Sequence, residues 1–404
     1  MKKDLPDEFC QLIRQQLPPE EYQQFILALQ EDPVCSVRLN KMKPADIFPQ
    51  ATPVPWCSQG RYLPVRPSFT LDPLLHAGCY YVQEASSMFI SHLIKQYVSG
   101  CPPLTCLDLC AAPGGKSTLL LDYLPAGSLL IANEPIRTRA NILKENIIKW
   151  GSPHVILTSN YPSDFSPFHS CFDLILCDAP CSGEGMFRKD PDSIAQWSMK
   201  NVLHCQERQR QIVTDIWDTL RDGGLFIYST CTYNHFEDED NVQWICDTLG
   251  ADTLPLCDQP EWGIRNGHFF PHRTRGEGFF VAIIRKRGDG RRKEIDTKKL
   301  HKHLTILLEG TEKTKITDKH RTPQPSISEA LSYATDKSRW TQAQLSHHEA
   351  VRYLHGEAIQ LPPHITERGY ILLTYQGHPL GFCKNIGTRA NNLYPSEWRI
   401  RKQV

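Results

Sequence analysis

Two cysteines and one aspartate follow apolar stretches of this chain and have the side chains that covalent catalysis needs. Asp178 and Cys181 come directly after the apolar run FDLILC, in the segment DAPCSGEG, and Cys231 comes directly after GLFIYST. A thiolate is a strong nucleophile that can form a transient bond to a substrate carbon, and a nearby carboxylate can bind the same substrate. We therefore consider these three residues as candidates for one catalytic site.

The placement of these residues depends on the strands before them. A continuous apolar run such as FDLILC is typical of a buried central strand, and parallel strands place their carboxyl ends at the same edge of a sheet, where open α/β folds bind ligands. Both thiols are then expected at one crevice. The alternative is that Cys181 and Cys231 only fill tight turns, since most of the fifteen cysteines should be small buried residues. Their twin placement after two strands favours catalysis.

The elements that would position the site extend from Thr105 to about Lys286. Apolar strand candidates alternate there with amphipathic helices, and the candidates are TCLDLC, SLLIANE, HVILTS, FDLILCDAP, GLFIYST and FFVAIIRK. Such alternation predicts an α/β domain, Rossmann-like, with a mostly parallel sheet covered by helices on both faces.

A glycine turn at the first strand predicts a cofactor site. The strand TCLDLC leads through Pro-Gly-Gly into a helix, which is the setting in which backbone N–H groups meet a ligand. About 20 residues on, Glu134 ends the next strand, where an acid binds ribose hydroxyls in dinucleotide folds. A P-loop is excluded because its first glycine would fall at Cys110. A nucleoside ligand without phosphates, such as S-adenosyl-L-methionine, fits this turn.

Four motifs in order carry a family resemblance. DLCAAPGGKST, ANE, DAPCSGEG and YSTCTYNHFEDEDNV resemble the Nop/Sun family of RNA cytosine-C5 methyltransferases, over about Tyr80 to Arg287. SVRLN and YYVQEASSM resemble segments that this family carries before its catalytic domain. The tail GYILLTYQGHPLGFCKN, followed by NLYP, resembles the PUA-like module of bacterial members that modify 16S ribosomal RNA.

The resemblance implies a role for each candidate residue. Cys231 would attack C6 of a cytosine, so that C5 becomes able to accept a methyl group, and Cys181 would assist removal of the C5 proton and product release. Asp178 would contact the cytosine and border both ligands, and Glu134 would bind the ribose. The turn around S-adenosylmethionine would consist of Cys110, Ala111, Ala112, Pro113, Gly114, Gly115 and Lys116. The target base must be extruded or single-stranded.

Several alternatives remain open at this stage. Pro180-Cys181 matches the dipeptide that DNA cytosine methyltransferases use as nucleophile, so the roles of the two thiols could be exchanged. The adenine contact could come from Asn160, from Asp164 or from neither. Transfer RNA is a second possible substrate, and a non-catalytic RNA-binding ribosome assembly factor is a second class of function. An amino-group methyltransferase is disfavoured because it would need a D/N-P-P-Y loop.

The length of 404 residues suggests two to four domains, at about 150 residues each. We expect an N-terminal α+β RNA-binding domain over 1–80, the methyltransferase domain over 81–287, a linker or middle region over 288–340, and a PUA-like RNA-binding β domain over 341–404.

Composition limits the partners and the location. Lys and Arg together number 45, as do Asp and Glu, so RNA contacts require local clusters of positive charge. The candidate clusters are Arg188 and Lys189, Arg273 and Arg275, Arg285 to Lys299, and Arg399, Arg401 and Lys402. Without a signal peptide or a long apolar run, we expect a cytoplasmic monomer that binds RNA and neither DNA nor membrane.

No metal is expected. The acidic run from Glu237 to Asp240 is typical of the first turn of a helix. His268, His272, His347 and His348 lack the spacing to cysteines that structural zinc sites show.

Overall fold

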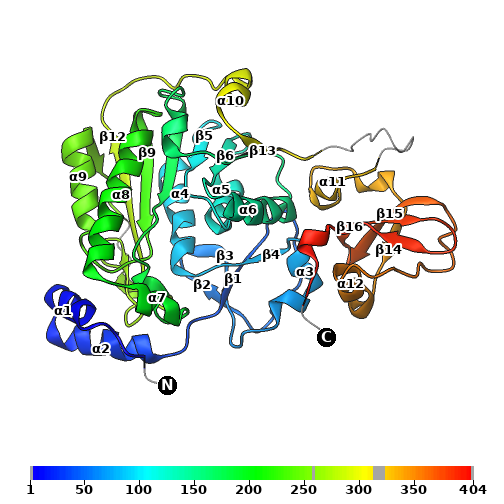
Figure 1. Cartoon of the computed structure of the whole chain (residues 1–404), viewed down its shortest axis with the longest axis horizontal. Helices are drawn as coiled ribbons and strands as arrows, with labels where there is room; N and C mark the ends of the chain where they lie inside the picture. The colour runs from blue at the N-terminus through cyan, green and yellow to red at the C-terminus, as the bar shows by residue number, and fades with distance from the viewer. Residues whose placement is uncertain (1–2, 257–259, 313–323, 402–404) are drawn as a thin grey trace.

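The computed structural model describes residues 3–256, 260–312 and 324–401. Its strands form a large central sheet and two four-stranded sheets, one from the N-terminal part of the chain and one from the C-terminal part. The C-terminal sheet lies at one end of the molecule, and helices α1 and α2 lie near the other end (Figure 1).

The central sheet contains the six strands that the alternation predicts. They are β5 (Thr105–Asp108), β6 (Leu129–Asn133), β7 (Val155–Thr158), β8 (Phe172–Asp178), β9 (Leu220–Thr230) and β12 (Phe279–Lys286). The order is β10-β12-β9-β8-β5-β6-β7-β13, and the strands from β9 to β7 are parallel. Strand β12 is antiparallel to β9. Strands β10 (Ala251–Thr253) and β11 (His268–Phe269) both pair antiparallel with β12.

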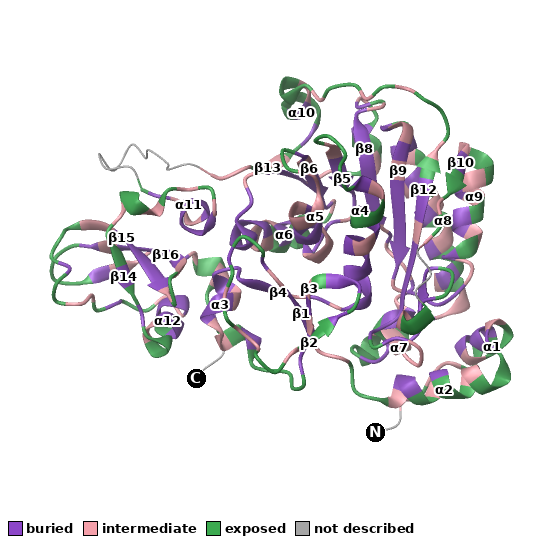
Figure 2. Cartoon of the chain, turned by 180° about the vertical axis from the view of Figure 1, so that it is seen from behind, coloured by how far each residue is buried: buried purple, intermediate pink, exposed green. Residues whose placement is uncertain are grey.

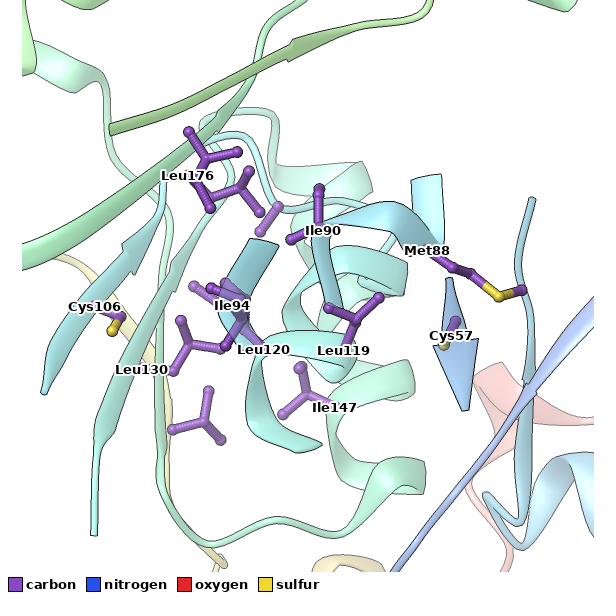
Figure 3. Packing of buried hydrophobic residues seen from close by; sticks show 14 of the residues in the cluster. Cys57, Met88, Ile90, Ile94, Cys106, Leu119, Leu120, Leu130, Ile147 and Leu176 are labelled. Carbon is purple, nitrogen blue, oxygen red and sulfur yellow. The ribbon is translucent and has the colours of Figure 1, made fainter. Parts of the chain in front are cut away.

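Helices cover both faces of this sheet, which confirms the predicted Rossmann-like fold. Leu174 and Leu176 of β8 belong to one buried cluster with α4 (Ile90–Val98), α5 (Gly115–Tyr123) and α6 (Arg137–Trp150) (Figure 3). Ile175 and Cys177 belong to a second cluster with α8 (Met199–Trp217) and α9 (Glu239–Leu249). Because alternate residues face opposite sides, the strand is buried along nearly its whole length (Figure 2).

The N-terminal part is α+β, as predicted. Its sheet has the order β2 (Thr52–Val54), β3 (Cys57–Tyr62), β1 (Ser36–Leu39) and β4 (Tyr80–Val82), and α3 (Pro73–His76) precedes β4.

Helices α1 (Asp7–Gln16) and α2 (Pro19–Gln30) pack against the segments that follow β8 and β9. The ring of Phe9 makes an edge contact with Phe187 at 5.0 Å between centroids, and Phe25 does so with Tyr233 at 4.9 Å. Both partners belong to segments that follow β8 and β9, so the N-terminal helices support these loops.

The region 288–340, which we predicted as a linker or middle region, also contributes to the central sheet. Strand β13 (Ile306–Glu309) pairs antiparallel with β7 and forms the edge of the sheet. Helix α10 (Thr297–His303) precedes it, and the short helix α11 (Ile327–Leu331) lies against α6 and β16. This region therefore links the sheet to the C-terminal part through packed elements.

The basic run from Arg285 to Lys299 lies away from the predicted catalytic edge. Strand β12 runs antiparallel to β9, so it ends beside the amino ends of the parallel strands. Arg292 Nη1 accordingly pairs with Asp173 at the start of β8 at 2.6 Å. The run therefore lies at the end of the parallel strands opposite to Asp178, and its contact with RNA phosphates stays a prediction.

The C-terminal sheet has the order β14 (Gln342–Gln344), β15 (Gly369–Tyr375), β16 (His378–Asn385) and β17 (Ala390–Asn392), with α12 (His347–Leu354) packed on it. Across the described ranges, every helix falls short of the length and apolar character that a bilayer span requires.

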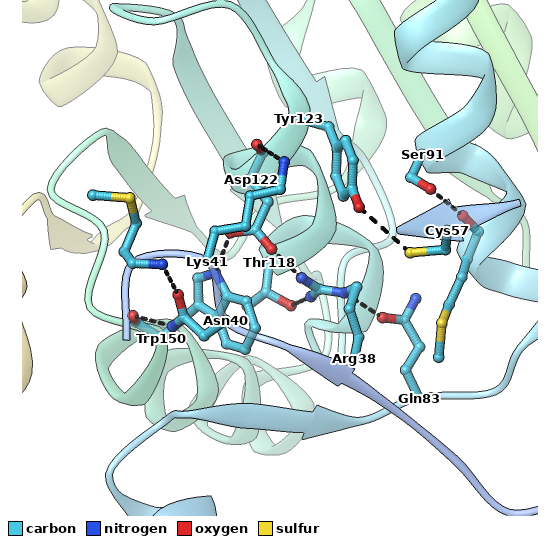
Figure 4. Close-up of polar contacts among 12 residues, drawn as sticks. Arg38, Asn40, Lys41, Cys57, Gln83, Ser91, Thr118, Asp122, Tyr123 and Trp150 are labelled. Carbon is cyan, nitrogen blue, oxygen red and sulfur yellow. Dashed lines mark hydrogen bonds and ion pairs between the residues drawn. The ribbon is translucent and has the colours of Figure 1, made fainter. Parts of the chain in front are cut away.

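A buried guanidinium fixes the N-terminal sheet to helix α5 beside the central sheet. Arg38 of β1 is fully buried, and its Nη2 donates to Thr118 Oγ1 of α5 at 2.6 Å while its Nε donates to Gln83 Oε1 at 2.8 Å (Figure 4). The same guanidinium pairs with Asp122 and lies over the ring of Trp150 at 4.4 Å. Arg38 thus holds α5, the helix after the glycine turn, against β1 and β4.

We predict that Arg38→Met lowers the free energy of unfolding by about 3 to 5 kcal/mol, because Asp122 would keep a buried charge without its cation. Denaturant unfolding measures this change. Lys41→Met is the matched control on the exposed side of the same segment and should cost less than about 1 kcal/mol. Equal losses in the two variants would contradict the role of Arg38.

Candidate active site

The carboxyl ends of β8 and β9 bring the three sequence candidates to one edge of the sheet. Asp178 is the last residue of β8 and lies opposite Ser229 in the parallel register, and Cys231 directly follows β9. Cys181 lies three residues beyond Asp178, before the 3-10 helix η4 (Glu184–Met186). The structure therefore brings together the residues that the sequence placed after two separate strands.

The two thiols are in direct contact. Cys181 Sγ and Cys231 Sγ lie 3.1 Å apart, and the backbone N–H of Cys231 donates to Cys181 Sγ at 3.4 Å. The contact with the Cys231 thiol, followed by burial, raises the pKa of Cys181 well above its usual range. Cys181 therefore keeps its proton at neutral pH.

Asp178 is held by two donors. Lys116 Nζ lies 2.7 Å from one carboxylate oxygen, and Ser229 Oγ donates to the other at 2.8 Å. Burial alone would lower the pKa of Lys116, but the Asp178 carboxylate, together with Cys231 and Asp108, outweighs burial and raises that pKa. Lys116, which the sequence assigned to the cofactor turn, thus directs its charge at Asp178, the carboxylate that we predicted to contact the substrate.

A cavity of about 160 Å³ lies beside Asp178. One wall is the predicted turn from Cys110 to Lys116, and the other wall comes from residues 81–84 and Ser87 of the N-terminal sheet and its following turn. We did not assign a role to Tyr81, Gln83 and Glu84 from the sequence. The segment YYVQEASSM was noted only as a resemblance, and no local pattern in it indicates that it lines a cavity with the turn from Cys110 to Lys116.

The turn itself has the predicted geometry for a close ligand. Gly114 has a φ of +113°, which L side chains rarely adopt, and α5 begins at Gly115. A Cβ at Gly114 would also lie 3.1 Å from Leu143 Cδ1. Ser117 Oγ in the first turn of α5 donates to the buried Asp108 at 2.6 Å, which ties the helix to the end of β5.

A second cavity, of about 300 Å³, lies on the other side of Cys110 and is lined by Glu134. Glu134 is buried, and its Oε1 accepts from the N–H of Ile136 at 3.0 Å. Its Oε2 accepts no hydrogen bond in the described structure, and Arg139 Nη1 is 3.5 Å away. A buried acceptor without a donor suits the hydroxyl groups of a ribose, so Glu134 fits the nucleoside part of S-adenosylmethionine.

The two candidates for an adenine contact do not line this cavity. Asp164 Oδ2 accepts from the N–H of Tyr161 at 2.9 Å and stabilises a local turn, whereas Asn160 Oδ1 accepts from the N–H of Thr305 at 2.9 Å and links the segment after β7 to the residue before β13. Tyr161 and Pro162 line the cavity instead. Neither was recognised in the sequence, because an exposed Tyr-Pro in a loop carries no motif.

Part of the acidic run lies in the first turn of a helix, as predicted. Helix α9 begins at Glu239, and Glu239 and Asp240 occupy its first turn. Ligand atoms of Asp238, Glu239 and His268 lie within 4.8 Å of one another, and His268 Nε2 is hydrogen-bonded to Glu239 at 2.7 Å. This hydrogen bond accounts for the proximity of the histidine, and we assign no metal to the group.

Three of the other predicted basic residues have partners within the structure. Arg188 is buried and pairs with Glu277 at 2.7 Å, Arg273 pairs with Glu21, and the guanidinium of Arg275 lies over the Tyr62 ring at 4.5 Å. Arg188 and Arg273 therefore form ion pairs within the fold, and contact of their clusters with phosphates stays a prediction. Lys189 is exposed, and Lys402 lies outside the described residues.

Another buried carboxylate, that of Glu184, lies between the loop that carries Cys181 and the loop that carries Cys231. Glu184 is fully buried and accepts hydrogen bonds from the N–H of Tyr233 at 2.8 Å, from Trp197 Nε1 at 2.9 Å and from Asn234 Nδ2 at 2.9 Å. Burial, and then the charge of Glu237, raise the pKa of Glu184 to about 7. Glu184 therefore connects the loop after β8 to the loop after β9.

Comparisons with known proteins agree with this architecture. Residues 102–285 match the family model of the 16S rRNA methyltransferase RsmB/F, residues 5–85 match the N-terminal domain of 16S rRNA methyltransferase RsmF, and residues 341–400 match the methyltransferase RsmF PUA domain. The ribosomal RNA small subunit methyltransferase F of Citrobacter koseri is 31% identical over 97% of this chain and 96% of its own length. The same enzyme of Salmonella arizonae is 30% identical over the same shares.

Two solved structures share the fold. A methyltransferase homolog protein from Pyrococcus horikoshii has a TM-score of 0.58 and 26% identity, over 67% of this chain and 92% of its own. NSun6 from Pyrococcus horikoshii, crystallised with SFG, has a TM-score of 0.61 and 19% identity, over 72% of this chain and all of its own.

The raised pKa of Glu184 predicts a pH-dependent stability difference. The folded state keeps the Glu184 proton up to about pH 7, whereas the unfolded state loses it near its ordinary value of 4.5. As pH rises through this window, the free energy of unfolding of the wild type should therefore fall by up to about 3 kcal/mol relative to that of Glu184→Gln. Denaturant unfolding of both proteins at about pH 5 and about pH 8 measures the difference, and a constant difference would contradict the prediction.

Proposed function

Because this chain belongs to the ribosomal RNA small subunit methyltransferase F family, whose members are S-adenosylmethionine-dependent methyltransferases of 16S ribosomal RNA, we propose that it methylates C5 of a cytosine in that RNA. The observation that carries the proposal is the contact of two thiols at 3.1 Å beside the end of β8, where Asp178 lies. C5 of cytosine becomes nucleophilic only after a group adds to C6, and a thiolate can make this addition.

The cofactor would occupy the two cavities on either side of Cys110. S-adenosylmethionine supplies the methyl group from its sulfonium centre. In our proposal the residues from Cys110 to Lys116 surround its methionine part, Glu134 accepts from its ribose hydroxyls, and Tyr161 with Pro162 covers its adenine. The buried Oε2 of Glu134, which accepts no hydrogen bond in the described structure, supports this assignment.

Cys231 is the proposed nucleophile toward C6 of cytosine. The raised pKa of Cys181 keeps that thiol protonated, which makes it the poorer attacking group. Asp178 would contact the N3 and amino edge of the base, and Lys116 and Ser229 would keep its carboxylate oriented as charge develops on the ring.

Cys181 has the proposed role of assisting removal of the C5 proton and release of the product: as a protonated thiol it would donate to the Cys231 sulfur as that sulfur leaves C6, while the C5 proton passes to a water molecule. Its sulfur lies within contact of the Cys231 sulfur, so it remains close to the cytosine ring when the ring is attached to Cys231. Loss of the C5 proton re-forms the C5–C6 double bond and breaks the bond between C6 and the Cys231 sulfur, which returns the enzyme to its starting state.

We propose that the chain keeps the division into the regions 1–80, 81–287, 288–340 and 341–404, with RNA contacts from the first and the last. The target cytosine must leave any base stack to reach the cavity, which costs a few kcal/mol and favours a single-stranded or loop region. A ribosomal substrate also implies action in the cytoplasm.

We predict that Cys181→Ala accumulates a covalent complex with 16S ribosomal RNA, because the addition can proceed but release is impaired, and that Cys231→Ala forms none. Incubation with labelled S-adenosylmethionine followed by denaturing gel electrophoresis measures both. The reverse pattern would move the nucleophile to Cys181. Absence of methylation of any RNA by the wild type would favour an assembly factor, and methylation of transfer RNA alone would change the substrate.

We further predict that Tyr161→Ala weakens the binding of S-adenosylmethionine about 5- to 150-fold, since stacking of a base on an aromatic ring is worth about 1 to 3 kcal/mol. Isothermal titration calorimetry measures the dissociation constant. Tyr161→Phe keeps the ring and serves as control. Unchanged affinity in the alanine variant would remove Tyr161 from the adenine site.

A further inference from the structure

Glu237 is fully buried and contacts the loop that carries Cys181. Its Oε2 accepts from the N–H of Ser182, the residue after Cys181, at 3.0 Å, and from Gln209 Nε2 at 2.7 Å. Gln209 Nε2 also donates to the carbonyl oxygen of Pro180 at 3.0 Å. Glu237 therefore holds both neighbours of Cys181, one directly and one through Gln209.

Asp238, the next residue, contacts the segment that carries Cys231. It is also fully buried, and its Oδ1 accepts from Thr230 Oγ1 at 2.5 Å and from Thr232 Oγ1 at 3.1 Å. These threonines flank Cys231 on both sides in the sequence. One carboxylate oxygen thus holds the side chains of the residues directly before and after this thiol.

Capping of α9 does not explain these two burials. The first turn of the helix already contains Glu239 and Asp240, whose side chains are 51% and 44% exposed. Among the residues that the structure describes, no Lys or Arg forms an ion pair with Glu237 or Asp238. Buried carboxylates are costly unless their hydrogen bonds are needed, and the bonds made here go to the two thiol segments.

We propose that Glu237 and Asp238 are positioning residues with separate tasks, Glu237 for the loop of Cys181 and Asp238 for the segment of Cys231. The consequence for catalysis rests on the proposed function. Each carboxylate would act through hydrogen bonds to the neighbours of its thiol and would not touch the substrate.

The side chains suggest variants that separate the two tasks. In Glu237→Gln the NH2 group would replace one carboxylate oxygen and bring a donor against the donor of Gln209 or that of Asn234. Asp238→Leu removes the shared acceptor, whereas Asp238→Asn keeps it and should restore function. Thr232→Val removes one donor and repeats the test at Cys231 if Asp238→Leu does not fold. Asp240→Asn is the matched control in the same acidic run, and thermal unfolding reports on folding of each variant.

The first readout is independent of RNA. Peptide-resolved mass spectrometry under single-hit alkylation gives the iodoacetamide reaction rates of Cys181 and Cys231. We expect Glu237→Gln to change the Cys181 rate at least about fivefold more than the Cys231 rate, and Asp238→Leu or Thr232→Val to do the opposite, as the loss of a hydrogen bond to a charged group implies. Asp240→Asn should change neither. Parallel changes at both thiols, or no change in either, would overturn the proposal.

The second readout follows the covalent RNA complex. Glu237→Gln should accumulate it, as Cys181→Ala is expected to do, and Asp238→Leu should reduce it at least about fivefold even when combined with Cys181→Ala. If both variants lose methylation equally and the covalent complex neither accumulates in Glu237→Gln nor falls in Asp238→Leu, the two carboxylates have only a structural role. If the wild type and Cys181→Ala form no complex with any RNA, the proposed function fails, and the alkylation rates still decide whether the carboxylates position the thiols.

Discussion

The parallel pairing of β8 with β9 is the constraint on which the candidate site depends. Its register sets Asp178 opposite Ser229, so the segments that continue from both strands leave the sheet side by side. The sulfur atoms of Cys181 and Cys231 can meet only because of this pairing, since the two residues lie fifty positions apart in the chain. A shift of one residue in either strand would turn its side chains to the other face of the sheet.

The surroundings of this edge are built from buried polar groups. Each such group costs free energy unless it is hydrogen-bonded, and here the partners come from different parts of the chain. Arg38 joins the N-terminal sheet to α5, and Glu184 joins the loops after β8 and β9. The N-terminal part also supplies a wall of the cavity beside Asp178. The site therefore requires the N-terminal and central parts of the chain together.

The regular part of this structure was predictable from the sequence. Apolar runs alternate with amphipathic helices, and that pattern is sufficient to indicate the parallel strands and the edge at which Asp178, Cys181 and Cys231 meet. The position of the basic run after Arg285 was not predictable, because it depends on the reversed direction of β12. The partners of Arg188 and the lining by Tyr161 were also missed, since both follow from contacts between distant segments and from no local pattern.

The central claim is that Cys231 bonds to C6 of a cytosine while Cys181 completes the reaction. It is tested most directly with 16S ribosomal RNA that contains 5-fluorocytidine, in which C5 carries no proton to remove after methyl transfer. Mass spectrometry of the digested complex identifies the cross-linked peptide. A peptide joined to RNA through Cys231 is the result that the assignment predicts, and a cross-link through Cys181, or none while unmodified RNA is methylated, would contradict it.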